Sequence, residues 1–340
     1  MKRIVMVVFL VILLAGIFAG WKIFGPTVSA PEGKFFYINT GSSYQKVKND
    51  LQQQSIISGD FFLDQMARQA KYDKNIRPGR YEIKDGMSLY NLLRMLKSGS
   101  QSPVRLVINK LRTKEDLAKK IGQQFECDSL NVINFLSNND SLLKYSLDSH
   151  TVMTAVIPNT YLVNWNTDFK KIFRRLKDEQ EKFWNKERKQ KAADKNLSPT
   201  QVYIMASIVE EETNKLKDKG LIASVYINRI NKGMKLEADP TVKYAMRDFG
   251  LRRILHGHLK YQSAYNTYQQ TGLPPGPICT PSAETINAVL DAPQTNYIFF
   301  VAKPDFNGYS NFAENYQDHL KYAKEYQEAL NELIRKKQTP

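Results

Sequence analysis

The pattern of apolar and polar positions repeats three times in the N-terminal third of the chain. Each repeat runs from a β-rich strand through a turn into a helix, and the expected N-caps of these helices are Ser43, Ser88 and Thr113. An isoleucine stands five positions before each cap, and apolar residues stand four and eight positions after it, so each helix has one apolar face. The spacing predicts a compact strand-and-helix region over residues 34–125.

Helical spacing with loops between the helices continues beyond this region. Residues 169–193 are dense in Lys, Arg and Glu, with an intermittent apolar face, which is typical of a solvated helix or connector. A helix over residues 221–231 should turn Leu221, Val225 and Ile230 inward and stop at Gly233. The chain therefore continues as a mainly helical middle section.

The last hundred residues read as loops, one strand and a closing helix. Residue 234 begins a loop-rich stretch, MKLEADPTVKYAM, and a second follows as YQSAYNTYQQTGLPPGPICTPS, whose prolines and glycines favour rigid turns. The run YIFFV at residues 297–301 predicts a buried strand. Residues 314–337 predict an amphipathic helix with Tyr322, Tyr326, Leu330 and Leu333 inward.

The start of the chain carries the strongest apolar signal. Lys2 and Arg3 precede an uncharged run over residues 4–21, which as a helix would span about 27 Å and cross the hydrocarbon core of a bilayer. The basic residues favour an inside N-terminus and a translocated remainder. Val28-Ser29-Ala30 resembles a cleavage site, so a removed signal peptide is the alternative, but the length of the run favours an uncleaved anchor.

Composition narrows the partners and the compartment. The net charge is +15 among 340 residues, an excess that would attract anionic polymers, lipid head groups or nucleic acid. Export argues against nucleic acid and leaves anionic cell-wall glycopeptide and the membrane surface. Cys127 and Cys279 are the two cysteines, so the chain is no disulfide scaffold, although a single bridge stays open.

One helix, QVYIMASIVEEETNK at residues 201–215, places three adjacent glutamates in three environments. With about 100° per residue, Glu212 falls near the middle of an apolar stripe, Glu210 points to the opposite side and Glu211 lies on the flank. A carboxyl group among apolar side chains has a raised pKa and can act as a general acid near neutral pH. A solvated charge run at a helix end is the alternative. The apolar stripe consists of Ile204, Met205, Ile208 and Val209.

Several other chemistries lack their motifs. The sequence has no G-x-S-x-G elbow, P-loop or H-E-x-x-H, and neither serine nor cysteine catalysis has a convincing base. His256 and His258 stand two positions apart, for which a structural role is favoured over a metal site. Nothing in the sequence indicates a metal or an organic cofactor.

The acids remain, and they suit cleavage of a glycosidic bond. Such cleavage needs a proton donor at the leaving oxygen, and a hydrolase adds a second carboxylate, for which Glu237 and Asp239 are candidates. Asp239 precedes Pro240, however, and Asx-Pro is also a common turn opener. Without a second acid, a hydroxyl of the sugar can attack, and one glutamate then gives a proton and later removes one.

Five blocks of the sequence carry a family resemblance. In order, they resemble successive blocks of the MltG/YceG-like endolytic murein transglycosylases, whose E-x-E-T pattern puts the catalytic glutamate at Glu212. The helix-face argument selects the same residue. The blocks are ASIVEEET (206–213), SVYINRI (224–230), LEADPTVKYAM (236–246), AYNTY (264–268) and TGLPPGPICTPS (271–282).

The resemblance implies a membrane-bound enzyme that cuts peptidoglycan glycan strands internally, between N-acetylmuramic acid (MurNAc) and N-acetylglucosamine (GlcNAc), and leaves 1,6-anhydro-MurNAc ends. It also implies a role in terminating nascent strands, with cell-wall synthases as partners. By motif position, further residues line or support the groove. They are Asn228, Glu237, Asp239, Thr241, Tyr244, Asn266, Thr267, Tyr268, Gly272, Pro274, Pro275 and Gly276.

The expected architecture is α+β. It comprises a membrane anchor and linker over residues 1–30, a LysM-like module over residues 34–104 and a catalytic domain over residues 105–340. Glu237 stands where the family often has Gln, and such an acid could alter the pKa of Glu212 by like-charge repulsion. A muramidase-type hydrolase using Glu237 or Asp239 therefore stays open, as does a non-catalytic peptidoglycan-binding scaffold.

Overall fold

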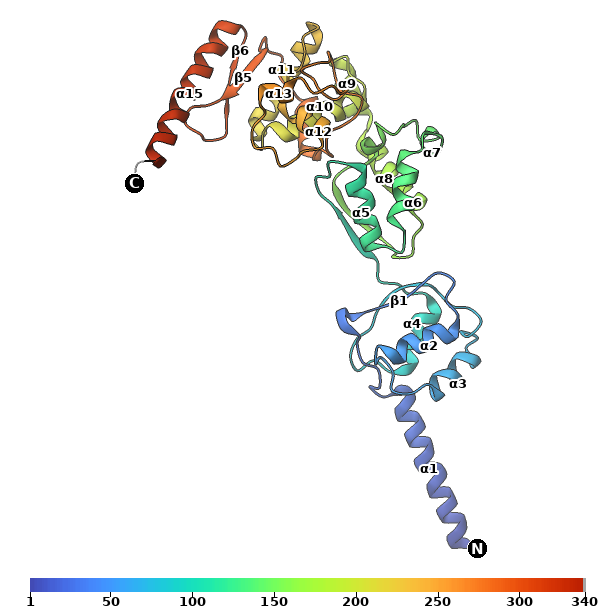
Figure 1. Ribbon diagram of the computed structural model, residues 1–340. Coiled ribbons are helices and arrows are strands. Elements are labelled where there is room, and N and C mark those ends of the chain that lie inside the picture. Colours follow the sequence, from blue (N-terminus) through green and yellow to red (C-terminus); the bar gives the residue numbers. More distant parts are fainter. Residues whose placement is uncertain (339–340) are drawn as a thin grey trace. The chain divides into compact units, whose positions relative to one another are not determined.

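The computed structural model describes residues 1–338 and contains both helices and strands. The chain divides into two compact units, each coloured along the sequence in Figure 1. The first unit comprises residues 1–106, 122–127 and 161–168. The second comprises residues 107–121, 128–160 and 169 onward.

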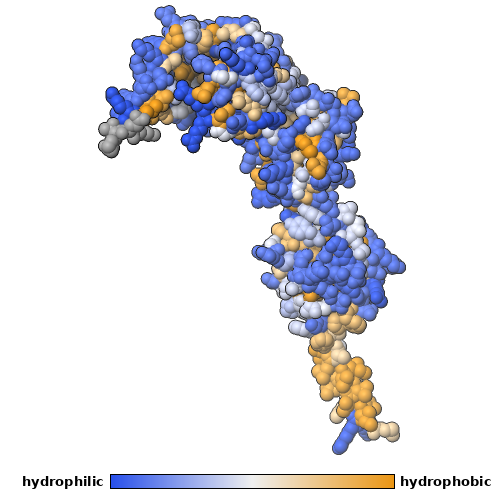
Figure 2. Space-filling model, viewed as in Figure 1, coloured by the Kyte–Doolittle hydropathy of each residue, from blue (hydrophilic) through white to orange (hydrophobic). Residues whose placement is uncertain are grey.

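The N-terminal helix α1 (Lys2–Phe24) carries a long uncharged run between basic residues at its two ends. Among the described residues it is the one helix long and apolar enough to cross a membrane, and its span is not buried in the protein. Figure 2 shows its surface as almost continuously hydrophobic. Gly25 follows the helix, and its backbone N–H donates to the Trp21 carbonyl oxygen at 2.8 Å. The predicted apolar N-terminal helix is confirmed.

The rest of the first unit is built on a two-stranded antiparallel sheet whose strands are distant in sequence. Strand β1 (Phe35–Ile38) pairs with β2 (Gly79–Glu82), so that Phe35 lies opposite Glu82 and Ile38 opposite Gly79. Between them lie α2 (Tyr44–Gln53) and α3 (Phe61–Gln69), and α4 (Leu89–Ser98) follows; a short 3-10 turn, η1 (Glu32–Lys34), precedes β1. The unit's own core contains Phe36, Leu51, Tyr72, Tyr81 and Leu92.

The predicted helix caps are confirmed, but the grouping of the three repeats is wrong. Ser43 and Ser88 accept from the backbone N–H groups of Lys46 and Asn91, and Thr113 accepts from Asp116. The strand of the third repeat, β3 (Val104–Ile108), pairs with β4 (Asn159–Val163) instead of β1 or β2. Strand, turn and cap chemistry is local and does not decide which strands pair.

The remaining elements are mostly helices. From the third repeat to the middle of the chain they are α5 (Lys114–Gln124), α6 (Ser129–Ser137), α7 (Asn139–Leu143), η2 (Val152–Ala155), α8 (Phe169–Phe183) and α9 (Lys186–Asp194). From there onward they are α10 (Pro199–Glu212), α11 (Leu216–Asn231), α12 (Asp239–Met246), α13 (His256–Leu259), α14 (Ala283–Leu290), β5 (Phe299–Ala302), β6 (Ser310–Ala313) and α15 (Tyr316–Gln338).

Helix α10 is the centre of the second unit. It begins with a capping box in which Ser198 and Gln201 bond each other's backbone, and Pro199 occupies its first turn. Every side chain over residues 202–209 is buried, because α9, α11, α12 and α14 pack around it. The expected single apolar face is therefore wrong: this part of α10 has no solvent face.

Several other predicted elements need correction. Residues 239–246, predicted as loop, form α12, because an Asp-Pro pair suits a first helical turn as well as it suits a β-turn. Residues 169–193 form two helices, and α8 buries one face. The predicted strand YIFFV starts at Phe299 and is half-buried, because it pairs only with β6 in a hairpin on which α15 packs.

Two predictions on helices are confirmed in part. Gly233 follows α11 with a φ of 67°, but the helix starts at Leu216, and its inward face includes Ile222 and Tyr226. On α15, the four side chains expected to point inward are half-buried.

Candidate active site at the end of α10

Glu212 is the last residue of α10 and is half-buried. Its Oε1 accepts a hydrogen bond of 2.7 Å from the hydroxyl of Tyr226, a buried residue of α11. Among residues 1–338, no Lys, Arg or His forms an ion pair with it. A carboxyl group so placed has lost water and gained one neutral donor.

Burial raises the pKa of Glu212 from 4.5 to about 7. The Tyr226 hydrogen bond opposes this rise, because it favours the charged form. The charge of Asp239 raises the pKa further, whereas Lys243 lowers it. Asp239 and Lys243 both belong to α12, so charges on this helix shift the pKa of Glu212 in opposite directions. A group with a pKa near 7 can both donate and accept a proton at neutral pH.

The two preceding glutamates are neutralised by cations. Glu210 accepts from the buried Lys219 at 3.1 Å and from Ser282 at 3.1 Å, and it also contacts Thr285 of α14. These contacts anchor the end of α10 to α14. Three adjacent residues of one type thus have three surroundings, as the sequence predicts.

Glu211 forms ion pairs with Lys110 at 2.8 Å and Arg112 at 3.1 Å. Burial would raise the pKa of Glu211, but these two cations outweigh it and hold the pKa below its ordinary value. Glu211 therefore stays ionised at neutral pH and cannot supply a proton there.

Asp239 and Tyr268 form a hydrogen-bonded pair that acts on Glu212. The Tyr268 hydroxyl donates to Asp239 Oδ1 at 2.7 Å, and Asp239 is the exposed first residue of α12. Burial, with the charge of Asp239, raises the pKa of Tyr268, so its hydroxyl remains a donor. Tyr268 thus orients the Asp239 carboxylate, whose charge acts on the pKa of Glu212.

Glu237 has a cation of its own. Its Oε2 accepts from Arg229 Nη1 at 2.9 Å, and the same guanidinium donates to the carbonyl oxygens of Ile298, Lys235 and Leu236. Glu237 also has a φ of 54° and an N–H that donates to the Thr267 carbonyl oxygen at 3.2 Å. These bonds tie the 235–237 turn to α11.

The Asn-Thr-Tyr loop is held from beneath by buried hydroxyl and amide groups. Thr267 Oγ1 lies 2.8 Å from Thr241 Oγ1 and accepts from the Ala238 N–H at 3.0 Å. Asn266 Nδ2 donates to the carbonyl oxygens of Leu259 and Tyr261 at 3.0 and 2.7 Å. Thr241, Asn266 and Thr267 are completely buried, so they position Asp239 and Tyr268 and do not themselves line a groove.

The Pro-Pro loop lies beside a pair of tyrosines. The rings of Tyr244 and Tyr265 are 4.7 Å apart, and the Tyr265 hydroxyl lies 3.3 Å from His150 Nδ1. Gly276 faces the same histidine so closely that a Cβ would collide with the His150 carbonyl oxygen. Gly272 has a φ of 77°. Pro274 is buried and Pro275 half-buried.

The end of this loop passes behind α10. The Ile278 N–H donates to Ser207 Oγ at 3.0 Å, and the Cys279 thiol donates to the Ser207 carbonyl oxygen at 3.3 Å. Burial raises the pKa of Cys279, so the thiol is neutral. The cysteine, for which the sequence offers no account, packs the loop against the centre of the unit.

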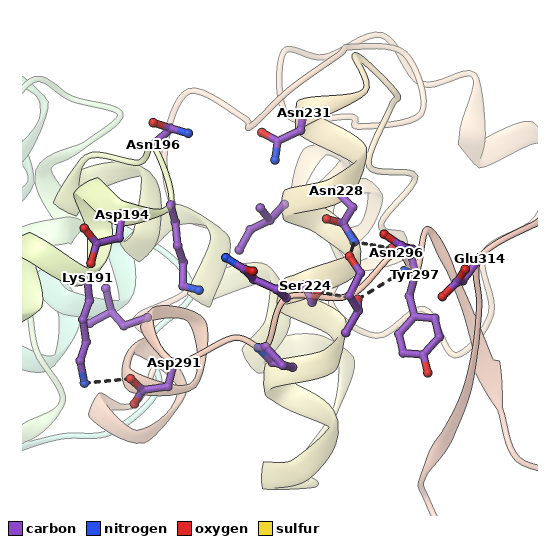
Figure 3. A pocket seen from close by; sticks show the side chains of 16 residues that line it. Lys191, Asp194, Asn196, Ser224, Asn228, Asn231, Asp291, Asn296, Tyr297 and Glu314 are labelled. Carbon is purple, nitrogen blue, oxygen red and sulfur yellow. Dashed lines mark hydrogen bonds and ion pairs between the residues drawn. The ribbon is translucent and has the colours of Figure 1, made fainter.

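Asn228 lies on another side of α11 from Tyr226. Two residues along a helix correspond to a rotation of about 200°, and Asn228 Nδ2 donates to the carbonyl oxygens of Thr295 and Tyr297 at 2.8 and 2.9 Å. It lines a cavity of about 950 Å³ that does not include Glu212 (Figure 3).

Sequence reasoning misses the partners of the acidic residues at this site. Tyr226 lies in the SVYINRI block. The hydroxyl of a buried tyrosine usually has a hydrogen-bond partner, so the sequence could have indicated that Tyr226 bonds a polar group. Lys219, Arg229 and Lys243 have no such signal, because lysine and arginine on a helix are most often solvated. His258 caps α13, since its Nδ1 accepts from the Leu255 N–H at 3.2 Å.

A family model matches most of the chain. The model of the YceG-like family matches residues 36–325. The chain belongs to the YceG-like family. The match covers most of the first unit's core as well as every residue described around Glu212.

Curated relatives of this YceG-like protein carry one name. The endolytic murein transglycosylase of Bacillus subtilis (strain 168) is 27% identical over 311 residues, with 87% of this chain and 85% of that protein covered. The endolytic murein transglycosylase of Streptococcus pneumoniae serotype 2 is 26% identical over 360 residues. That comparison covers 92% of this chain but only 62% of the pneumococcal protein.

A solved structure of a yceG-like protein from Listeria monocytogenes has the same fold. The TM-score is 0.57 at 24% identity, with 85% of this chain and 99% of that chain covered.

Proposed function

We propose that this protein is a membrane-anchored lytic transglycosylase that cleaves peptidoglycan glycan strands internally. It cuts the MurNAc–GlcNAc bond and leaves 1,6-anhydro-MurNAc ends. One observation carries the proposal: Glu212 is withdrawn from water without a cation, and its pKa lies at about 7. Membership of a family whose relatives are named endolytic murein transglycosylases supports the same reaction.

Glu212 acts first as an acid and then as a base. Its carboxyl proton passes to the glycosidic oxygen as the bond from that oxygen to C1 of MurNAc breaks. The C6 hydroxyl of the same MurNAc then bonds to C1, and its proton passes to the Glu212 carboxylate. No water is consumed, and Glu212 ends protonated. A pKa near 7 suits both steps, since neither protonation state is strongly disfavoured.

The neighbours of Glu212 have distinct roles in this scheme. Tyr226 orients the carboxyl group through its 2.7 Å hydrogen bond. The carboxylate of Asp239, oriented by Tyr268, favours the protonated form of Glu212 and faces the positive charge that develops at C1. The exposed rim around Glu237, Asp239 and Tyr268 contacts sugar, whereas the buried threonines and Asn266 support it.

The remaining parts of the chain hold the catalytic site at the membrane and bind the glycan. Helix α1 anchors the protein in the cytoplasmic membrane by a single span, with the remainder outside the cytoplasm. Residues 34–104 act as a LysM-like glycan-binding module, and residues 105–340 form the catalytic domain. An anchored enzyme of this specificity terminates nascent strands, which makes cell-wall synthases its partners.

The proposal is tested by product analysis. Purified peptidoglycan is incubated with the full-length protein or its Glu212→Gln variant, and the released muropeptides are identified by mass. The wild-type protein should release anhydro-MurNAc products, and the variant should be slower by about a thousandfold, which is typical of losing a general acid. Undiminished cleavage by the variant would remove Glu212 from the mechanism.

A muramidase-type hydrolase is the second candidate, because the charge of Asp239 is close enough to raise the pKa of Glu212. In that mechanism Asp239 would activate water or act on C1. Reducing ends in place of anhydro sugar would identify it. Retention of glycan with no released product from either protein would instead indicate a non-catalytic scaffold.

A further inference from the structure

A large cavity lies on the side of α11 that Tyr226 does not occupy. Its volume is about 950 Å³, which falls in the range of small-molecule sites. Ser224, Ile227, Asn228 and Asn231 of α11 form its wall, and their spacing places them in one stripe along the helix. The C-terminal end of α9 and residues 291–297 complete it, as Figure 3 shows.

The floor of the cavity is rigidly built. Asn228 Nδ2 donates to the carbonyl oxygens of Thr295 and Tyr297 at 2.8 and 2.9 Å, and Ser224 Oγ lies 2.7 Å from Thr295 Oγ1. These bonds hold the 295–297 segment against α11 (Figure 3). Among the described residues, no donor pairs with Asn228 Oδ1, so an acceptor remains in the floor.

Side-chain amides crowd the rim. Asn196, Asn231 and Asn296 line the cavity and are labelled in Figure 3. None of their side-chain amides has a hydrogen-bond partner within residues 1–338. Each amide offers two N–H donors and one carbonyl acceptor. The rim therefore presents alternating donors and acceptors, which match a ligand rich in hydroxyl and amide groups.

The charges in the cavity do not favour an anion. Lys191 is paired with Asp291 at 2.9 Å, and Lys195 Nζ donates to the Ala292 carbonyl oxygen at 2.7 Å, so both cations are engaged. The carboxylate of Glu314 lines the opposite side, unpaired among the described residues. Tyr297 adds a half-buried ring. Amides, a ring face and no available cation together describe a saccharide site.

We propose that this cavity is a second saccharide-binding site, which holds an uncharged, hydroxyl- and acetamide-bearing segment of a glycan strand away from Glu212. The inference rests on the proposed function, because the strand to be cleaved is the saccharide at hand. Helix α11 carries both Tyr226 and the cavity wall, so it fixes the position of the second site relative to Glu212. A strand held there would be cut at a distance from the held segment.

The test measures binding without cleavage. Full-length protein carrying Glu212→Gln in detergent is titrated with oligomers of N-acetylglucosamine, which carry hydroxyl and acetamide groups and no charge, with and without Asn231→Ala and Asn296→Ala together. Each lost hydrogen bond should weaken binding about fivefold, so the dissociation constant of the double variant should rise about twenty-fivefold. A matched control is Asn131→Ala with Asn134→Ala on α6, two exposed asparagines without side-chain bonds among the described residues. This control should bind within twofold of the parent.

Asn231 and Asn296 are exposed and have no side-chain hydrogen bond among the described residues, so the double variant should keep the parent's melting temperature, which checks folding. In protein with Glu212 intact, the double variant should raise KM for long strands and leave kcat unchanged. Glycan binding equal to that of the control overturns the inference. So does a loss confined to a synthetic stem peptide, which would make the cavity a peptide site.

The two proposals fail separately. If the wild-type protein releases no anhydro product but glycan binding still depends on Asn231 and Asn296, the proposed reaction fails and the second site stands. If cleavage proceeds and binding ignores both asparagines, only the second site is lost.

Discussion

Two carboxylates at the same end of α10 have surroundings that differ chiefly in whether a cation is present. Glu210, toward α14, has the ammonium group of Lys219 at 3.1 Å, and the exposed fractions of the two side chains are 15% and 6%. Glu212, toward α12, has the hydroxyl of Tyr226 and no cation among the described residues. Both have lost water. The comparison teaches that burial produces a proton donor only where no cation compensates for it.

The largest effect should come from breaking the Glu210 pocket. Lys219→Met keeps the length of the side chain but leaves Glu210 as an uncompensated buried charge, which typically costs 3–5 kcal/mol, so about 4 kcal/mol of unfolding free energy should be lost. Denaturant unfolding of the full-length protein in detergent measures it. Lys217→Met, at an exposed position of the same helix, is the control and should change stability by less than about 0.5 kcal/mol. A loss below about 1 kcal/mol would remove the structural contrast between the two glutamates.

The Glu212 pocket should respond with the opposite sign. Its folded pKa of about 7 exceeds the ordinary 4.5, so the folded state binds the extra proton, and stability falls as pH rises between those values. Glu212→Gln abolishes this fall and should stabilise the protein by about 3 kcal/mol at pH 8, with little effect at pH 4. Unfolding of both proteins at pH 4, 6 and 8 checks the trend. A constant difference across this range would contradict the assigned pKa.

Tyr226→Phe should sharpen the role of the neutral partner. The hydroxyl favours the charged form of Glu212, so its loss raises the pKa of Glu212 further, and the pH–rate profile should move to higher pH. Loss of one hydrogen bond that orients the acid should slow turnover by about five- to tenfold. Release of anhydro products measured from pH 5 to pH 9 gives both quantities. A profile displaced to lower pH would show that the Tyr226 hydrogen bond favours the protonated form of Glu212, which would contradict the account.

Asp239→Asn should have the smallest effect. Removing this charge lowers the pKa of Glu212, so the profile should move to lower pH, while turnover stays within about tenfold of the wild type. The asparagine can still accept the Tyr268 hydrogen bond. A loss of a thousandfold or more would instead make Asp239 a second catalytic acid and favour the hydrolase.

Local signals in the sequence account for much of the fold. The caps at Ser43 and Ser88 and the glycine after α11 are each decided within a few residues, and the structure has them where the sequence predicts them. Pairing of strands is not local, which is why the partners of β3 and β5 could not be read from the chain. The Asp-Pro start of α12 is ambiguous in principle, since the same pair opens turns and helices.

The environment of the candidate site could be predicted only in part. A helix-face argument selects Glu212, yet the surrounding helix is buried on all sides over residues 202–209, so no apolar stripe distinguishes it. Glu210 and Glu212 differ in their partners on α11: Lys219 pairs with Glu210, and Tyr226 bonds Glu212. Such partners are set by helix packing, which a single sequence does not disclose.

The claim that Glu212 is a proton donor can be measured directly. Infrared difference spectra of the wild type minus the Glu212→Gln variant, recorded from pH 4 to pH 9, isolate the carbonyl stretch of this one protonated carboxyl group. We predict that the band persists in mildly acidic solution and disappears with a midpoint near pH 7. A band already absent above pH 5.5 would mean that Glu212 is an ordinary ionised carboxylate, which would contradict the account.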